Sequence, residues 1–108
     1  MTAEQLERYI TQFEHVYFTG PYGEETITKD LQNRQASDRL STLGSNPRQT
    51  YLVSEKKKVY FEHFDKLEED LKLGLGMLQK SYPNHALIPR FERCQNQVAK
   101  LRNLVQNF

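Results

Sequence analysis

The sequence has few of the features that mark secreted proteins. It contains one cysteine, Cys94, among 108 residues, so no internal disulfide can form. A chain without disulfides is typical of a reducing compartment. The first ten residues also lack the basic start and the apolar core of a signal peptide. We therefore expect a cytoplasmic protein, or a nuclear one if the source is eukaryotic.

An excess of charge of one sign is also absent. Fifteen Lys and Arg residues nearly balance fourteen Asp and Glu residues, which leaves a formal net charge of +1. This balance gives no overall field that would attract nucleic acid or an anionic membrane, so such binding needs a local patch. No apolar run approaches the roughly 20 residues that span a bilayer. We expect no membrane insertion.

The motifs of enzymes and metal sites are missing as well. The histidines, His15, His63 and His85, stand alone, and no HExxH or CxxC spacing occurs. There is no glycine-rich phosphate loop and no Ser-His-Asp pattern. Cys94 lies on the apolar face of a predicted helix, and we interpret it as a small buried hydrophobe rather than a nucleophile. The sequence thus predicts no catalytic residue, no metal and no cofactor.

The composition favours a single, small hydrophobic core. Only 37% of residues are hydrophobic and 27% are charged, but six Phe and six Tyr can each bury a large area. A chain of this length has room for one domain, residues 1–108. With so little apolar surface, we expect either an elongated bundle or a core that is completed by a partner.

The first helix is predicted over residues 3–18. Thr2 and Gln5 have the spacing of a capping box at its start, and Gly20 with Pro21 ends it. The apolar residues of this stretch recur at helical spacing and form one continuous face. They are Leu6, Tyr9, Ile10, Phe13, Val16 and Tyr17.

Two further strong helices are predicted over 47–82 and 89–107. Pro47 and Pro89 stand at first helical positions, where proline is favoured, and a short connection makes the two helices antiparallel. We expect a break in the first of them near 54–58, where no core position is well filled. The apolar heptad positions are Val53, Tyr60, Phe64, Leu67, Leu71, Gly74 and Leu78 in the first helix, and Phe91, Cys94, Val98, Leu101, Val105 and Phe108 in the second.

Gly74 and Gly76 lie inside the long predicted helix, where each costs about 1 kcal/mol relative to alanine. A hinge is one explanation. We favour close approach of another helix, because Gly74 occupies a core heptad position and would face a second backbone there.

Residues 24–45 give a weaker signal. A helix over 26–43 can bury Ile27 and Leu31, but the stretch that follows them is polar. We expect a loosely packed helix here, with a flexible connection as the alternative. The fold class predicted for the whole chain is therefore all-α: an antiparallel helical bundle of three strong helices and one weaker helix.

Two groups of residues are candidates for binding. Phe18, Pro21 and Tyr22 at the first turn either fold back on the end of the bundle or stay exposed as anchors for a partner protein. The second group is a basic patch suited to nucleic acid or an acidic partner surface. It comprises Arg48, Lys56, Lys57 and Lys58.

Amphipathic helices without catalytic groupings predict a non-enzymatic protein–protein interaction module, an adaptor or assembly subunit. It would present helix surfaces to another protein or to a second copy of itself, as a homo- or hetero-oligomer of coiled-coil character. The alternative is a nucleic-acid-binding accessory protein that uses the basic patch.

Overall fold

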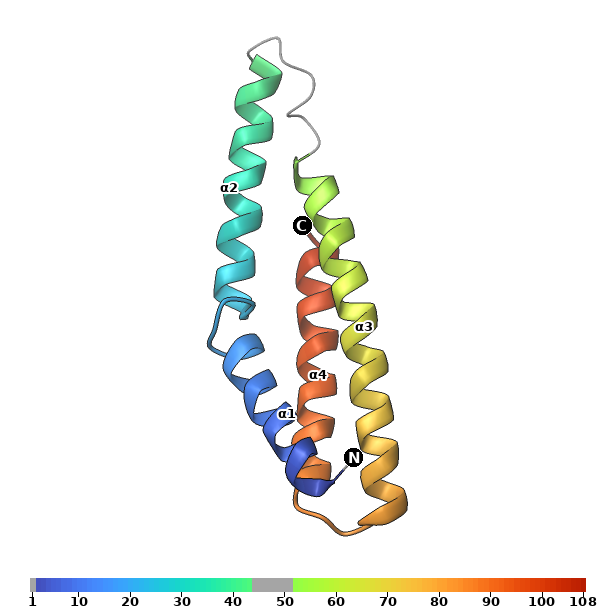
Figure 1. Cartoon of the computed structure of the whole chain (residues 1–108). Coiled ribbons are helices and arrows are strands. Elements are labelled where there is room, and N and C mark those ends of the chain that lie inside the picture. The colour runs from blue at the N-terminus through green and yellow to red at the C-terminus, as the bar shows by residue number, and fades with distance from the viewer. Residues whose placement is uncertain (1, 44–51) are drawn as a thin grey trace.

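The chain is a four-helix structure in a computed structural model that describes residues 2–43 and 52–108. The helices are α1 (Ala3–Tyr17), α2 (Glu24–Leu43), α3 (Leu52–Ser81) and α4 (Leu87–Gln106), and the described residues include no strand (Figure 1). The predicted all-α helical bundle is confirmed. The molecule is elongated, with extents of 59 × 20 × 20 Å.

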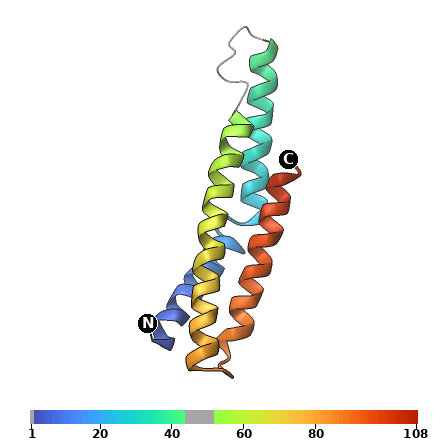
Figure 2. The ribbon, with the colours of Figure 1, turned by 90° about the vertical axis from the view of Figure 1, so that its right-hand side faces the viewer.

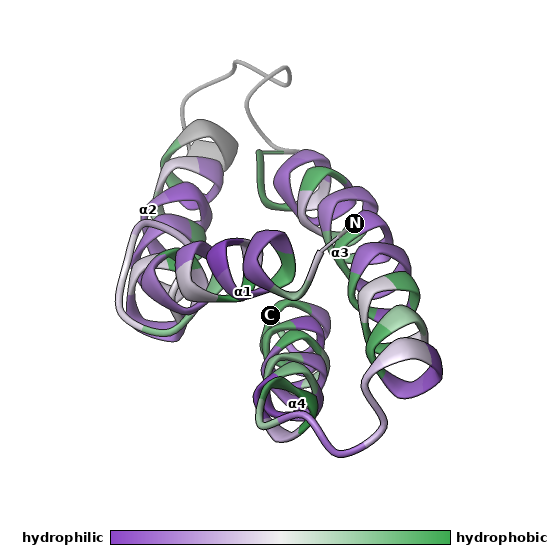
Figure 3. Ribbon diagram, turned by 60° about the horizontal axis from the view of Figure 1, so that its bottom comes forward, coloured by the Kyte–Doolittle hydropathy of each residue, from purple (hydrophilic) through white to green (hydrophobic). Residues whose placement is uncertain are grey.

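The longest packed unit is the antiparallel hairpin of α3 and α4. The shorter helices α1 and α2 follow one another along this hairpin, so that α1 covers its lower half and α2 its upper half (Figures 1 and 2). The two shorter helices therefore pack along different parts of the hairpin, and the upper end of α2 extends beyond the C-terminal end of α4 (Figure 1). Figure 3 shows polar and apolar residues on different sides of α1, α3 and α4, as expected of helices that are buried on one face, whereas α2 is mostly polar.

The hydrophobic core follows the predicted heptad positions. In α3 the buried residues recur every three or four positions, and α4 buries a second stripe against them. Each fully buried side chain of this kind contributes about 1.5–3 kcal/mol. The largest fully buried side chains are Ile10, Ile27, Leu31, Phe64, Leu71, Leu78, Phe91, Cys94, Val98, Leu101 and Val105.

Both ends of α1 form as the sequence indicated. The Thr2 hydroxyl accepts a hydrogen bond from the Gln5 amide at 3.2 Å, and the Thr2 amide donates to the Gln5 side chain at 2.9 Å. The chain then turns between Gly20 and Gly23, whose amide donates to the Gly20 carbonyl at 3.0 Å. A Cβ atom on Gly20 would lie 2.1 Å from the carbonyl oxygen of His15, so only glycine fits there.

Two predictions about the long helices were wrong. The predicted break at 54–58 does not occur. Helix α3 runs without interruption from Leu52 to Ser81, and a side chain of α2 caps its first amides. The last helix begins at Leu87 rather than Pro89. Pro89 is the third helical residue, and the first turn of a helix tolerates proline because its amides have no intrahelical partner. The predicted start at Pro47 lies outside the described residues.

The weaker segment forms α2, which begins at Glu24. Its first half is anchored by Ile27 and Leu31, which are fully buried, whereas Leu40 further along is 68% exposed. The predicted weaker helix is therefore present over residues 24–43.

Gly74 is required by close packing, as predicted, although its neighbour is not a backbone. A Cβ atom at this position would lie 2.6 Å from Cε1 of Phe91, a fully buried ring of α4. Nothing lies within 4 Å of the equivalent point on Gly76. Close packing therefore explains Gly74 and leaves Gly76 unexplained.

Candidate functional site: a groove between α1 and α3

The first helix packs on α4 and leaves its side toward α3 open. Close backbone approaches join α1 to α4 rather than to α3, and two adjoining hollows of about 330 and 280 Å³ lie between α1 and α3. Tyr9 and Asp70 line both hollows, so we treat them as one site, the α1–α3 groove. It is lined by Leu6, Tyr9, Gln12, Phe13, Val16 and Tyr17 of α1, by His63, Lys66, Leu67, Asp70, Leu73 and Gly74 of α3, and by Phe91 of α4.

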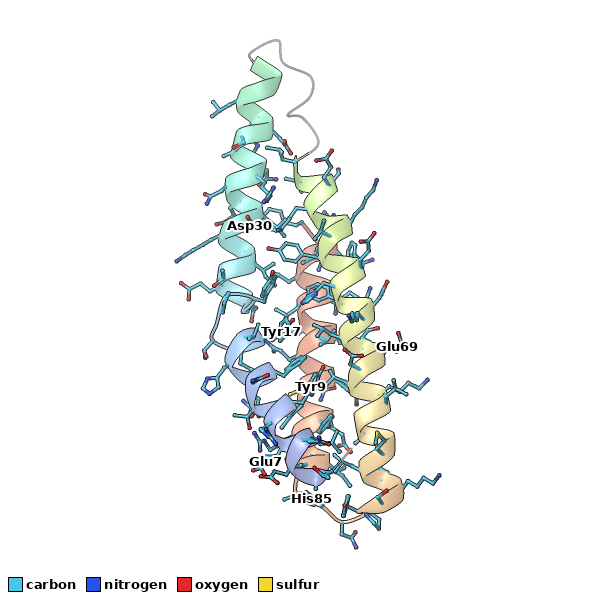
Figure 4. The ribbon with its side chains drawn as sticks, in the orientation of Figure 1. Glu7, Tyr9, Tyr17, Asp30, Glu69 and His85 are labelled. Atoms are coloured by element: carbon cyan, nitrogen blue, oxygen red, sulfur yellow. The ribbon has the colours of Figure 1, made fainter. Side chains whose placement is uncertain are left out.

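Aromatic rings form the middle of the groove. The Tyr9 ring stacks on Phe91, with centroids 6.4 Å apart, and lies at the same distance from Phe13. Figure 4 shows Tyr9 and Tyr17 on the side of α1 that faces α3. The Tyr9 hydroxyl is buried and has no hydrogen-bond partner among the described residues. Burial raises the pKa of Tyr9 to about 12, so this hydroxyl keeps its proton.

The upper end of the groove is closed by a histidine between two tyrosines. The Tyr17 hydroxyl is hydrogen-bonded to Nε2 of His63, and the Tyr22 ring stacks on the imidazole with centroids 5.3 Å apart. Burial lowers the pKa of His63, and the nearby Lys66 ammonium lowers it further. The imidazole is therefore neutral at pH 7, and its Nε2 can accept a hydrogen bond from the Tyr17 hydroxyl.

The rim of the groove on α3 carries one charge of each sign. Lys66 and Asp70 lie one helical turn apart, and both line the first hollow. Below them, Leu73 at the edge of the groove is 61% exposed. From there the apolar surface continues past the groove to Met77, which is 37% exposed. The groove therefore opens onto further apolar surface of the same helix.

Polar contacts hold α1 in place on α4. The Arg90 guanidinium donates to the Glu14 carboxylate at 2.5 Å and to the Thr11 hydroxyl at 3.2 Å. The buried amide of Gln97 donates to the Tyr17 carbonyl at 2.8 Å, which satisfies one of the last carbonyls of α1. These contacts fix α1 on α4, and the Tyr17–His63 hydrogen bond joins its C-terminal end to α3.

The structure folds two of the three predicted anchor residues back onto the bundle. Phe18 is half-buried under the Arg93 guanidinium, which lies 4.6 Å from the ring centroid. Tyr22 remains 38% exposed but contacts His63 at the upper end of the groove. Pro21 is exposed. Of this group, Tyr22 alone borders the groove.

The structure does not gather the predicted basic patch on one face. Consecutive helical residues project about 100° apart, and the Lys56 ammonium lies over the Tyr60 ring, 5.1 Å from its centroid. Lys57 donates instead to the Gln106 carbonyl of α4 at 3.4 Å, and Lys58 is exposed. Tyr60 is buried, so it is not placed to stack on a base. The remaining member, Arg48, lies outside the described residues.

Groups for metal binding do not converge in residues 2–43 and 52–108. No cluster of three His, Cys, Asp or Glu side chains there is arranged to hold a metal ion. Burial raises the pKa of the Cys94 thiol to about 12, which leaves it protonated. In the same part of the chain, no helix combines the length and the apolar character that crossing a membrane requires.

Sequence reasoning missed the groove, because the apolar stripe of α1 does not show which neighbouring helix it lies against. The available signal lies on α3, where Val59, Leu73 and Met77 are apolar but stand outside the predicted core positions. All three are exposed. Apolar residues one position away from a core stripe indicate a second contact face on the same helix.

Comparison of the chain with family models, curated proteins and solved structures finds no match. The class of protein therefore follows from the fold and its groove. It is an all-α helical bundle whose lower half has an open side between α1 and α3.

Proposed function

We propose that the protein is a non-enzymatic interaction module, an adaptor or assembly subunit, that receives a helix of a protein partner in the α1–α3 groove. The observation that carries this proposal is the apolar groove itself, which continues into the 61% exposed side chain of Leu73. Exposed apolar surface next to a preformed groove is characteristic of protein interaction sites.

The shape of the groove favours a helix as the occupant. From Leu6 to Tyr17 it follows about three turns of α1, or about 16 Å. A further helix lying there would contact both α1 and α3, which is the arrangement of neighbouring helices in a four-helix bundle. Helix-in-groove recognition uses apolar anchors spaced along one face of the bound helix. The mixed charges of Lys66 and Asp70 at the rim suit a partner with polar residues beside those anchors.

A photo-crosslinking amino acid placed in the groove tests this function. We would introduce it at Gln12, which is exposed and lines the groove, and at Gln79, which is exposed on a different face of α3. We expect protein crosslinks in cells from position 12 and not from position 79. Leu73→Glu should suppress them, because it places a charge on the apolar surface. Equal crosslinking from both positions, or none from either, would contradict the proposal.

We place this activity in the cytoplasm, or in the nucleus of a eukaryotic cell. The alternative of nucleic-acid binding through Lys56, Lys57 and Lys58 stays a prediction. It requires affinity that falls steeply with salt and that a triple Lys-to-Glu change removes. Fluorescence anisotropy at two salt concentrations measures both.

A further inference from the structure

Helix α3 carries a second stripe of residues beside its buried one. The second stripe consists of Val59, His63, Lys66, Asp70, Leu73 and Met77. Its spacing alternates between four and three residues, as in the contact seam of a coiled coil. It is displaced from the buried stripe by one residue, or about 100° around the helix. Five of the six residues, all but Val59, line the groove or the hollow below it.

The second stripe is complementary to its own reverse. If two copies of α3 lie antiparallel about an axis at the level of residue 68, Lys66 faces Asp70 of the other copy. In the same register His63 faces Leu73, and Val59 faces Met77. Every layer then joins either opposite charges or side chains with apolar faces. Because the arrangement is twofold, each pair occurs twice.

We infer that the occupant of the α1–α3 groove is a second copy of this chain, whose α3 lies antiparallel to the first. This inference rests on the proposed function and names its partner. Two Lys66–Asp70 ion pairs lie at the centre of the interface. The 54% exposed Val59 and the 37% exposed Met77 cover one another at both ends. The net charge of +1 adds little repulsion between copies.

The position of α1 is consistent with a twofold axis at the level of residue 68. Near one end of α1, Leu6 approaches Gly74, with its Cδ2 atom 3.5 Å from the point where a Cβ would lie. At the other end, the Tyr17 hydroxyl is hydrogen-bonded to His63. Helix α1 therefore flanks the stretch 63–74, whose midpoint is close to residue 68. In the dimer, α1 and α3 of each copy form one symmetric layer of four helices.

The same register also sets the length of the interface. One layer beyond the Val59–Met77 pairs, Lys56 and Lys80 would face each other, and like charges oppose contact there. Lys56 already lies over the Tyr60 ring of its own chain. Glu69 stands at the outer edge of the second stripe and points away from α1 (Figure 4), where solvent and salt screen its charge.

Charge reversal provides the test, using sedimentation velocity of the full chain over a range of concentrations. We expect the wild type to reach twice the chain mass of 12.8 kDa. Lys66→Glu and Asp70→Lys should each weaken the dimer at least about tenfold, because each places like charges together in two layers. The double variant should restore association, since Glu at 66 then faces Lys at 70. Lys29→Glu, the same charge change at an exposed residue of α2 outside the second stripe, should leave the dimer unchanged.

The outcomes separate this inference from the proposed function. A wild-type chain that stays monomeric, or a dimer that survives both single reversals, overturns the antiparallel α3 pairing. Crosslinks from position 12 to other proteins would then leave the groove function standing, whereas their absence as well would remove both. If circular dichroism shows that a charge variant is unfolded, the dimer is tested with the Leu73→Gln variant instead. The 61% exposed Leu73 is not needed for folding, and an unchanged dimer in that variant overturns the inference.

Discussion

The Asp38 carboxylate of α2 accepts a hydrogen bond from the backbone amide of Leu52, the first residue of α3, at 3.0 Å. Its second oxygen accepts from the Val53 amide at 3.1 Å. The first amides of a helix have no partner within the helix, and a negative charge there also interacts favourably with the helix dipole. Asp38 therefore acts as a cap supplied by another helix and joins the upper part of α2 to α3.

Replacing this cap should destabilise the bundle. We expect Asp38→Ala to lower the free energy of unfolding by about 1 kcal/mol, within the range of 0.5–2 kcal/mol known for helix caps. Asp38→Asn keeps an acceptor oxygen and should lose less. Urea denaturation at a fixed protein concentration measures the difference. Asn33→Ala, an exposed change on the same helix, is the control, and an equal loss in both alanine variants would argue against the cap.

The two glycines of α3 should respond to alanine in opposite directions. Gly76→Ala meets nothing within 4 Å and should stabilise the protein by about 1 kcal/mol through helix propensity. Gly74→Ala gains the same propensity but forces a Cβ to within 2.6 Å of the buried Phe91 ring. Overpacking of this kind costs about 1–3 kcal/mol, so the net effect should be neutral to destabilising. Thermal unfolding followed by circular dichroism separates the two, and a stabilised Gly74→Ala variant would contradict the close packing.

The core could be predicted because it depends on local periodicity. The capping box of Thr2 and Gln5 and the heptad stripe from Tyr60 to Leu78 are both contained in short windows of sequence. The Asp38 cap could not be found in this way, because 13 residues separate Asp38 from Leu52 in the chain and the two meet only in the folded bundle. The predicted break at 54–58 rests instead on the lack of well-filled core positions there, and in the structure α3 is continuous through this stretch.

The candidate site escaped prediction for a different reason. An apolar stripe on α1 shows that one face is buried but not against which helix, and here the close backbone approaches of α1 are to α4. The predicted anchor Tyr22 lies beside this opening. Residues 56–58 form a basic run in the sequence, but their side chains project in different directions from one helix.

Acid should destabilise the fold through His63. Burial holds its pKa below the ordinary value of 6.5 in the folded chain, so the unfolded chain binds more protons between the two values. The contribution of the neutral His63 to stability is therefore fully present above pH 6.5, and it is lost as the pH falls through the pKa of His63 in the folded chain. We expect the midpoint temperature of unfolding to fall between pH 7.5 and 5.5.

His63→Gln should flatten this dependence, because glutamine keeps an acceptor for Tyr17 but does not titrate. His15→Gln, at an exposed histidine of α1, should leave the slope unchanged. Both variants are compared with the wild type at one protein concentration, since association also shifts the midpoint. An unaltered slope in His63→Gln would assign the pH dependence to other groups.

Removing a tyrosine hydroxyl should have opposite effects at two positions of the bundle. The Tyr60 hydroxyl donates to the Asp30 carboxylate at 2.8 Å and joins α3 to α2, whereas the buried Tyr9 hydroxyl has no partner within the described part of the chain. A hydrogen bond to a charged group contributes about 1.5–3 kcal/mol, and an unsatisfied buried polar group costs about 1–3 kcal/mol. Tyr60→Phe should therefore lower the free energy of unfolding, and Tyr9→Phe should leave it unchanged or raise it. Urea denaturation of the two variants gives the comparison, and a clear loss in Tyr9→Phe would mean that its hydroxyl is hydrogen-bonded in solution.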